Sequence, residues 1–231
     1  MWPIYDYGYS RTRQSKAGSL QFADNGKGRR VSTLTLTLGR PTLADTIFSR
    51  SLTTDLVLVT SGAALTAVMA QIAVPLYPVP ITGQTLAVLL VGSTLGASRG
   101  MLSMVLYMLL GVVGLPVFTD ASSGFSVLAG TTGGYIIGFI FAAGLTGWLA
   151  QRNWDKKFLG AAVSFLGGTV VTFAFGLAWL AIATGGTLEQ VLLWGLYPFI
   201  IGGVIKAAIA AAIIPSTWKV TESIARKRDQ K

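Results

Sequence analysis

Long stretches of this chain carry almost no charge, and this pattern limits its possible folds more than any other feature. Between residues 56 and 151 the only charged side chains are Arg99 and Asp120, and residues 158–188 have none. Crossing the hydrocarbon of a bilayer takes about 20 apolar residues. A backbone inside the bilayer must satisfy its own hydrogen bonds, so such stretches are expected to be helical. The sequence therefore predicts an all-α integral membrane protein.

Prolines, glycines and short charged stretches divide the apolar sequence into six expected transmembrane helices. The composition agrees, because 52% of the 231 residues are hydrophobic and 12% are charged. An average soluble domain has about 25% charged residues. The expected spans are residues 56–74, 82–97, 100–118, 133–150, 158–184 and 191–215.

The positions of the basic residues predict how these helices are oriented. With a cytoplasmic N-terminus, every Lys and Arg except Lys206 falls in a cytoplasmic segment, and the outer loops 75–81, 119–132 and 185–190 contain neither. Cytoplasmic loops of membrane proteins are enriched in Lys and Arg. We therefore expect both termini to be cytoplasmic and the protein to lie in the plasma membrane.

The chain is expected to have three parts. Residues 1–52 form a basic arm, expected to be disordered and to lie near anionic lipid headgroups. Residues 53–218 form the membrane domain, and residues 219–231 form a basic cytoplasmic tail. Topology accounts for the net charge of +9, so this charge is poor evidence for nucleic-acid binding. Membrane lipid is an expected partner, and nucleic acid is not.

The residue types present exclude most catalytic and metal-binding sites. The sequence has no His and no Cys, which rules out Ser–His and Cys–His nucleophile pairs, disulfides and zinc fingers. The ATP-binding pattern G-x-x-x-x-G-K-[ST] is absent, and the G-x-S-x-G match at residues 96–100 has no His partner. No carboxylate falls inside a predicted span, which argues against an autonomous proton-coupled transporter. We expect no enzymatic activity, no cofactor and no metal.

Lys206 is the one charged side chain inside a predicted span. Placing a Lys at the middle of a bilayer costs about 2.5–3.5 kcal/mol. One interpretation is that the side chain snorkels to a membrane surface. The other is that it faces a polar cavity, where an anionic or strongly hydrogen-bonding ligand compensates the charge. The position of Lys206 well inside residues 191–215 favours the cavity.

Two outer segments have the composition of a ligand-contacting surface. Residues 75–85 contain three prolines followed by Thr82, Gln84 and Thr85, so they combine stiffness with polar side chains. A simple rigid turn is the alternative. Residues 130–135 read Gly-Thr-Thr-Gly-Gly-Tyr at the start of a span, where a helix N-terminus offers free N–H groups. The tyrosine of this segment either stacks on a ligand or belongs to the aromatic belt of the membrane interface.

The first predicted helix carries small residues four positions apart, at Ala63 and Ala67. Faces of this kind let two helices approach closely. The face therefore serves either packing within the protein or docking to another subunit.

Four motifs, in this order along the chain, resemble the BioY family. They are Pro-Val-Pro-Ile-Thr-Gly-Gln-Thr (78–85), Leu-Gly-Val-Val-Gly-Leu-Pro-Val-Phe (110–118), Thr-Gly-Gly-Tyr (132–135) and Lys-Ala-Ala-Ile-Ala-Ala (206–211). The resemblance covers residues 56–215. Members of this family are the biotin-binding membrane subunits, or S components, of energy-coupling factor transporters.

The resemblance implies that the chain captures biotin near the outer surface and works with a transmembrane coupling subunit and cytoplasmic ATPase subunits. It implies that Lys206 is a pocket lysine and that Gln84 lies in a loop that closes over the ligand. It also implies that the face bearing Ala63 and Ala67 docks on the coupling subunit. The expected substrate-binding residues are Thr82, Gln84, Ser122, Thr132, Gly133, Tyr135 and Lys206.

Two residues depart from the family pattern. Gly203 stands where many members have Asp, which removes a salt-bridge partner of Lys206 and an acceptor for the ureido N–H groups of biotin. Thr131 replaces a common proline. Lys206 can meet either the carboxylate or the ureido carbonyl of biotin. The alternative functions are a binding subunit for another small vitamin and a membrane scaffold without a transport role.

Overall fold

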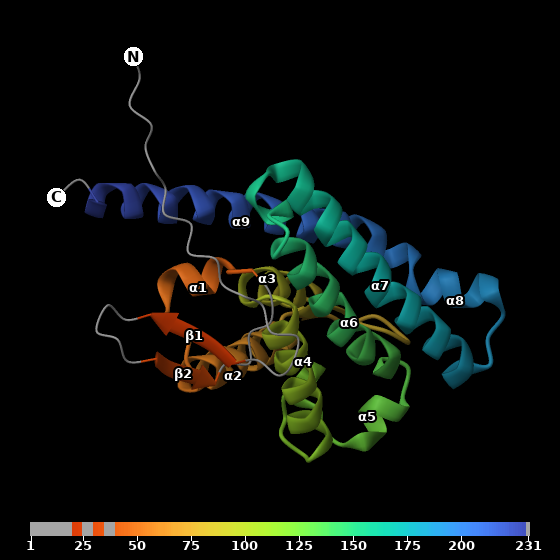
Figure 1. The fold of residues 1–231 in the computed structure, drawn as a ribbon. Coiled ribbons are helices and arrows are strands. Elements are labelled where there is room, and N and C mark those ends of the chain that lie inside the picture. The colour runs from red at the N-terminus through yellow and green to blue at the C-terminus, as the bar shows by residue number, and fades with distance from the viewer. Residues whose placement is uncertain (1–19, 25–29, 35–39, 230–231) are drawn as a thin grey trace.

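The computed structural model describes residues 20–24, 30–34 and 40–229. Within these residues the protein is mostly helical, and its long helices form a bundle (Figure 1). The long helices are α2 (Leu52–Ala70), α3 (Gln84–Leu95), α4 (Ala97–Val112), α6 (Gly133–Ala150), α7 (Phe158–Thr184) and α9 (Ile200–Asp229).

Shorter elements connect or flank the long helices. Strands β1 and β2 pair antiparallel, with Leu20 opposite Leu34, and strands β3 and β4 pair antiparallel between α2 and α3. The short elements are β1 (Leu20–Asp24), β2 (Arg30–Leu34), α1 (Leu43–Ile47), β3 (Ala73–Val74), β4 (Ile81–Thr82), η1 (Thr119–Ala121), α5 (Phe125–Ala129), η2 (Trp154–Lys156), α8 (Leu188–Gly195) and η3 (Tyr197–Phe199).

Local sequence determines where several helices begin and end. α2 begins after Ser51, whose side-chain oxygen accepts a hydrogen bond of 3.1 Å from the N–H of Thr54. A single residue, Gly96, separates α3 from α4 and has a φ of 86°, in a region that favours glycine. α7 ends at Gly185, which adopts the left-handed conformation with a φ of 63°.

α6 lies at the centre of the bundle, in contact with α3, α4 and α7. Small residues allow these helices to approach closely. A Cβ added to Gly92 of α3 would lie 2.2 Å from Oγ1 of Thr146 on α6. A Cβ added to Gly138 of α6 would lie 3.0 Å from the carbonyl oxygen of Thr172 on α7. At these two glycines a larger side chain would not fit between the helices.

The long apolar helices overlap the expected spans, although α2, α3 and α4 differ from them by up to six residues at their ends. α6 and α7 begin and end at the predicted residues. Among the described residues, four stretches are long and apolar enough to cross a membrane: α2, α6, α7 and Leu188–Ser223. α3 and α4 are apolar but shorter. The last predicted span differs, because η3, which contains Pro198, interrupts the helix between α8 and α9. α9 then continues to Asp229, through part of the expected tail.

The N-terminal end of the bundle differs from the disordered arm expected over residues 1–52. Thr42 begins α1 with a capping box, in which its N–H donates to Oδ2 of Asp45 at 2.8 Å. Leu43 and Ala44 of α1 are buried, so this part of the expected arm belongs to the folded bundle. The predictions for residues 1–19, 25–29 and 35–39 lie outside the described residues.

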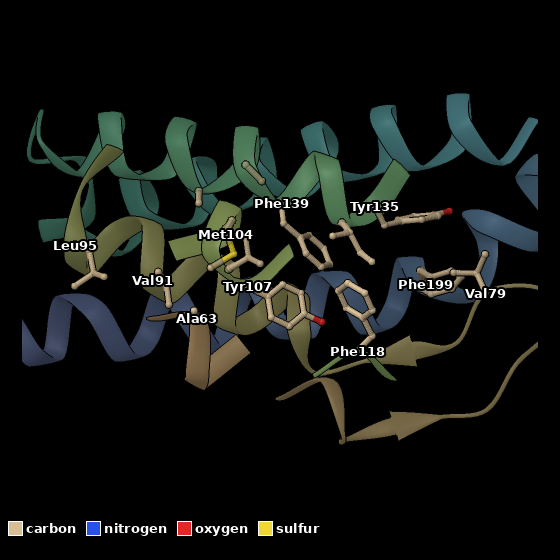
Figure 2. Close-up of a cluster of buried hydrophobic side chains, with 14 of the residues drawn as sticks. Ala63, Val79, Val91, Leu95, Met104, Tyr107, Phe118, Tyr135, Phe139 and Phe199 are labelled. Carbon is tan, nitrogen blue, oxygen red and sulfur yellow. The ribbon is translucent and has the colours of Figure 1, made fainter. Parts of the chain in front are cut away.

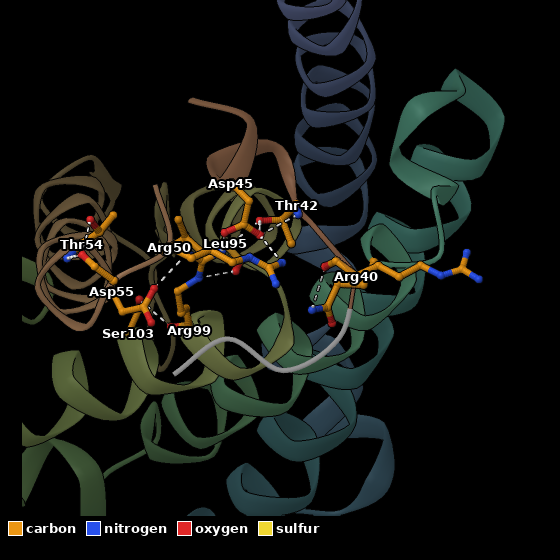
Figure 3. Close-up of polar contacts among 11 residues, drawn as sticks. Arg40, Thr42, Asp45, Arg50, Thr54, Asp55, Leu95, Arg99 and Ser103 are labelled. Carbon is orange, nitrogen blue, oxygen red and sulfur yellow. Dashed lines mark hydrogen bonds and ion pairs between the residues drawn. The ribbon is translucent and has the colours of Figure 1, made fainter. Parts of the chain in front are cut away.

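A buried arginine fastens α1 to the bundle (Figure 3). Arg99, expected in a cytoplasmic loop, lies in the first turn of α4 and its side chain is 1% exposed. It pairs with Asp45 at 2.9 Å and with Asp55 of α2 at 3.2 Å, and it donates to the hydroxyl of Thr42 at 3.1 Å. Its Nε also donates to the carbonyl of Leu95 at the end of α3. The sequence pattern did not predict these ion pairs, because Arg99 lies more than 40 residues from both of its acidic partners in the sequence.

Candidate functional site

A cavity of about 220 Å³ lies at the other end of the bundle, at the N-terminal end of α3. One water needs about 10–15 Å³ on the same scale, so the cavity has room for a small organic molecule. The connecting segments contribute Val79, Pro80, Phe118, Thr119, Asp120 and Ser122, and the helices contribute Leu89, Phe139, Thr169, Phe173, Gly203 and Lys206. We call this the cavity end and the opposite one the Arg99 end.

Lys206 reaches the cavity from the second turn of α9 and is half-buried. Its Nζ donates to the carbonyl oxygen of Thr82 and, at 3.2 Å, to Oγ1 of Thr85. Both acceptors are neutral, and none of the ion pairs in the described part of the chain includes Lys206. A buried cation without a counter-ion is costly, so an anionic or strongly polar ligand would stabilise it.

Thr82 and Gln84 form a small hydrogen-bonded unit beside Lys206. The hydroxyl of Thr82 donates to Oε1 of Gln84 at 2.8 Å, and Nε2 of Gln84 donates to the hydroxyl of Tyr107 on α4. Gln84 is 6% exposed and lines the cavity. The start of α3 therefore carries the polar side of the cavity and is connected to both α4 and α9.

Aromatic side chains form much of the remaining wall (Figure 2). The ring of Tyr135 packs edge to face against Phe173, with centroids 5.8 Å apart, and stacks on Phe199 at 6.4 Å. Its hydroxyl donates to the carbonyl of Gly195 at 2.8 Å. Phe118, on the opposite side, is 1% exposed. An apolar wall with a few converging polar groups is typical of small-molecule sites.

The connecting segment after α4 brings a carboxylate to the cavity. Asp120 is exposed, lines the cavity and has a φ of 57°, which aspartate tolerates better than most residues. Ser122 lies beside it and donates to the carbonyl of Thr119 at 2.7 Å. The cavity thus contains an ammonium group from a helix and a carboxylate from a loop.

The structure brings most of the predicted site residues together. The predicted residues that line this cavity are Thr82, Gln84, Ser122, Thr132, Tyr135 and Lys206. Gly133 is not among the lining residues. It is buried, and a Cβ there would lie 1.7 Å from the carbonyl oxygen of Leu128, so its contribution is the close approach of two backbone segments.

Ala63, expected on a docking face, lies inside the bundle in this structure. Ala63 is 1% exposed and packs in the hydrophobic core with Val88 and Val91 of α3. Ala67 is partly buried and packs against the same cluster. The small-residue spacing therefore reflects packing within the bundle, which was the other interpretation of this pattern.

Sequence reasoning missed Asp120 and, apart from Tyr135, the aromatic wall. Asp120 had a usable signal, because it is the one acidic residue in an outer loop that directly follows the motif ending at Phe118. Phe139, Phe173 and Phe199 had none, since hydropathy does not distinguish an aromatic side chain facing a cavity from one facing lipid. Tyr107 was also missed, because it lies behind Gln84 rather than in a polar segment.

The match to a family model decides to which protein family this chain is related. The model of the BioY family matches residues 40–223, which include α1 and nearly all of the helical bundle. The chain belongs to the BioY family.

Individual BioY proteins agree with this membership. The biotin transporter BioY of Rhizobium etli is 38% identical over 171 residues, which cover 70% of this chain and 91% of the relative. Biotin transporter BioY2 of Lactococcus lactis is 37% identical over 155 residues, covering 67% of this chain and 85% of the relative.

A solved structure extends the match to three dimensions. It is the crystal structure, at 2.1 Å, of the S-component for biotin from an ECF-type ABC transporter. It superposes with a TM-score of 0.63 and 26% sequence identity, covering 72% of this chain and 92% of that one. With the apolar helices, this membership makes the chain a multi-pass protein of the cell membrane.

Proposed function

We propose that this chain is the biotin-binding subunit of an energy-coupling factor importer, which captures biotin at the outer face and releases it inward with ATPase partners. One observation carries the proposal. In a member of the BioY family, a single cavity gathers the half-buried ammonium group of Lys206 with the polar side chains of Thr82 and Gln84. The names of the similar proteins specify biotin for those proteins.

The chemistry of biotin complements this cavity. Its apolar chain and fused rings suit the aromatic wall, and its ureido group both donates and accepts hydrogen bonds. Lys206 donates to an acceptor of biotin, either the carboxylate or the ureido carbonyl. Asp120 accepts from the ureido N–H groups, a role that Gly203 cannot fill because it has no side chain.

We propose six membrane-spanning segments, with both termini in the cytoplasm and the cavity end outside. α3 and α4, at 12 and 16 residues, are about 18 and 24 Å long, so their flanking segments complete the crossing. α1 and the far end of α9 lie at the same end of the bundle, which supports this orientation (Figure 1). The membrane domain then includes residues 40–52 in addition to 53–218.

The proposed partners are a transmembrane coupling subunit and cytoplasmic ATPase subunits. The chain has no P-loop, so ATP hydrolysis takes place on other subunits and this chain is not an enzyme. Ala63 is buried, so the docking face on α2 is better placed on its exposed residues. These include Leu56, Val57, Leu65 and Val68.

Equilibrium binding of labelled biotin to the purified protein in lipid nanodiscs tests the function. We expect Lys206→Met to weaken binding about tenfold or more, because a hydrogen bond to a charged group contributes about 1.5–3 kcal/mol. Lys219→Met, which removes a positive charge outside the cavity, is the matched control and should bind like the wild type. Methionine keeps much of the lysine volume, so cavity shape is conserved.

Three results would overturn the proposal in different ways. Unchanged biotin affinity of the Lys206→Met variant would show that biotin does not bind in the assigned cavity. Stronger competition by another unlabelled vitamin would favour a binding subunit for that vitamin. A membrane scaffold has no use for a cavity of this composition. Failure of the wild-type protein to bind any vitamin would favour the scaffold function.

A further inference from the structure

We propose that Tyr107, which does not line the cavity, positions the lysine that binds the ligand. This inference rests on the proposed function for its ligand. Tyr107 is 1% exposed and lies in the middle of α4. Its hydroxyl accepts the hydrogen bond from Nε2 of Gln84, so it contacts the site only through that side chain.

Gln84 connects Tyr107 to the residues that accept the hydrogen bonds of Lys206. Its Oε1 accepts from the hydroxyl of Thr82 at 2.8 Å, which fixes both ends of the amide. The carbonyl of Thr82 and the hydroxyl of Thr85 are in turn the acceptors of Lys206 Nζ. Gln84 lies between these two acceptors in the sequence, so holding its side chain holds the turn that carries both.

The ring of Tyr107 is itself held in place. It packs edge to face against Phe118, with centroids 5.5 Å apart and planes at 81° (Figure 2). Phe118 is held against the backbone of Gly111, where an added Cβ would lie 2.1 Å from the ring. The Tyr107 hydroxyl therefore has a fixed position from which to orient Gln84, as the residues supporting a binding site must have.

Tyr107→Phe separates positioning from packing, because it keeps the ring and its contact with Phe118 and removes only the hydroxyl. Gln84→Met breaks the same hydrogen bond from the other side. Ser103→Ala is the matched control: it removes a buried hydroxyl of α4 that donates within its own helix, to the carbonyl of Arg99. All variants are compared at equal fractions folded, from their thermal unfolding curves.

The first measurement needs no ligand. Acylation of Lys206 by a small amine-reactive probe, followed by peptide mass spectrometry, reports how firmly the amine is held. We expect Tyr107→Phe and Gln84→Met to accelerate this acylation severalfold and the double variant to do so no further. Ser103→Ala should acylate at the wild-type rate. Unchanged acylation in Tyr107→Phe would overturn the positioning role, whatever the ligand is.

The second measurement is biotin affinity in a double-mutant cycle. We expect Tyr107→Phe to weaken binding by about tenfold, with no further loss when it is added to Gln84→Met. Losses that add independently would overturn the connection through Gln84. Failure of the wild-type protein to bind biotin would overturn the proposed function alone, since the acylation result still decides the role of Tyr107.

Discussion

Two adjacent glycines in α9 differ in what surrounds them. Gly203 lines the cavity, and a Cβ added there would meet only Cγ2 of Thr169, at 3.6 Å. Gly202 has no atom within 4 Å of an added Cβ and does not line the cavity. The space at Gly203 is therefore part of the cavity, whereas the space at Gly202 is outside it.

The Gly203→Leu variant should lose biotin binding while keeping its fold. A leucine at this position has room for its Cβ, but its branched end extends into the cavity and occupies the ligand volume. We expect affinity to fall about tenfold or more, since overfilling a fitted site costs about 1–3 kcal/mol.

Gly202→Leu makes the same helix-stabilising change on the open side of α9 and should bind biotin normally. Titration of both variants with labelled biotin checks this. Equal affinity of the two would place the ligand elsewhere.

At the scale of elements, a buried carboxylate connects α9 to the segment between α6 and α7. Asp155, in η2, is 1% exposed and accepts a hydrogen bond of 2.6 Å from Nε1 of Trp218. Lys156 lies 4.3 Å from the Trp218 ring and 3.6 Å from Glu222. Burial raises the pKa of Asp155 to about 6, against the opposing effects of the Trp218 hydrogen bond and the Lys156 charge.

The raised pKa of Asp155 predicts that stability falls as the pH rises from about 4 to 6. The folded state holds the proton more tightly than the unfolded state, so ionisation of Asp155 favours unfolding, by about 3 kcal/mol above pH 6. Asp155→Asn keeps the acceptor for Trp218 and removes the titration. We expect this variant to unfold at a higher temperature than the wild type at pH 7.5 and at a similar temperature at pH 4.

Thermal unfolding in detergent between pH 4 and pH 8 measures this difference. Glu222→Gln, which alters a half-exposed carboxylate at the same end of α9, should leave the pH profile unchanged. An Asp155→Asn profile parallel to the wild type would show that another group titrates.

The contact of α1 with the bundle responds to pH in the opposite direction. Burial acts to raise the pKa of Asp45, but the hydrogen bond from Arg50, the Thr42 N–H and the charge of Arg99 outweigh it and hold the pKa below its usual range. A lowered pKa means that this ionised carboxylate stabilises the fold above pH 4 and that its contribution is lost as the pH falls below. The two carboxylates therefore act in separate pH windows.

At the scale of the whole molecule, the two ends of the bundle have different chemistry. Among the described residues, the loops at the cavity end carry Asp120 and Glu189 and neither Lys nor Arg, whereas Arg40 and Arg50 lie at the Arg99 end. This asymmetry is the basis for placing the cavity outside the cell.

Single cysteines test this orientation, because the sequence has no Cys of its own. Glu189→Cys is at an exposed position of α8 at the cavity end, and Glu222→Cys is on α9 at the Arg99 end. We expect a membrane-impermeant thiol reagent to label Glu189→Cys in intact cells and Glu222→Cys only after permeabilisation. Both substitutions remove one acidic residue, so they are matched in charge. The reverse labelling pattern would invert the proposed topology.

The sequence alone determined the bounds of α6 and α7, the approximate positions of the other apolar helices and the exceptional character of Lys206. The physical reason is that charged side chains are excluded from the hydrocarbon of a bilayer. Their spacing along the sequence therefore marks the membrane helices, and a single lysine inside such a helix is conspicuous. The motifs around Thr82 and Gln84 added the polar side of the cavity, through a family resemblance.

Only the tertiary structure decided which residues meet. Tyr107 reaches Gln84 from another helix, Arg99 joins Asp45 to Asp55, and Ala63 faces inward rather than outward. These contacts depend on how each helix is rotated about its axis and displaced along it, and that is settled by side-chain packing between helices. Hydropathy is nearly the same on every side of a helix that is apolar throughout, so it carries little information about those rotations.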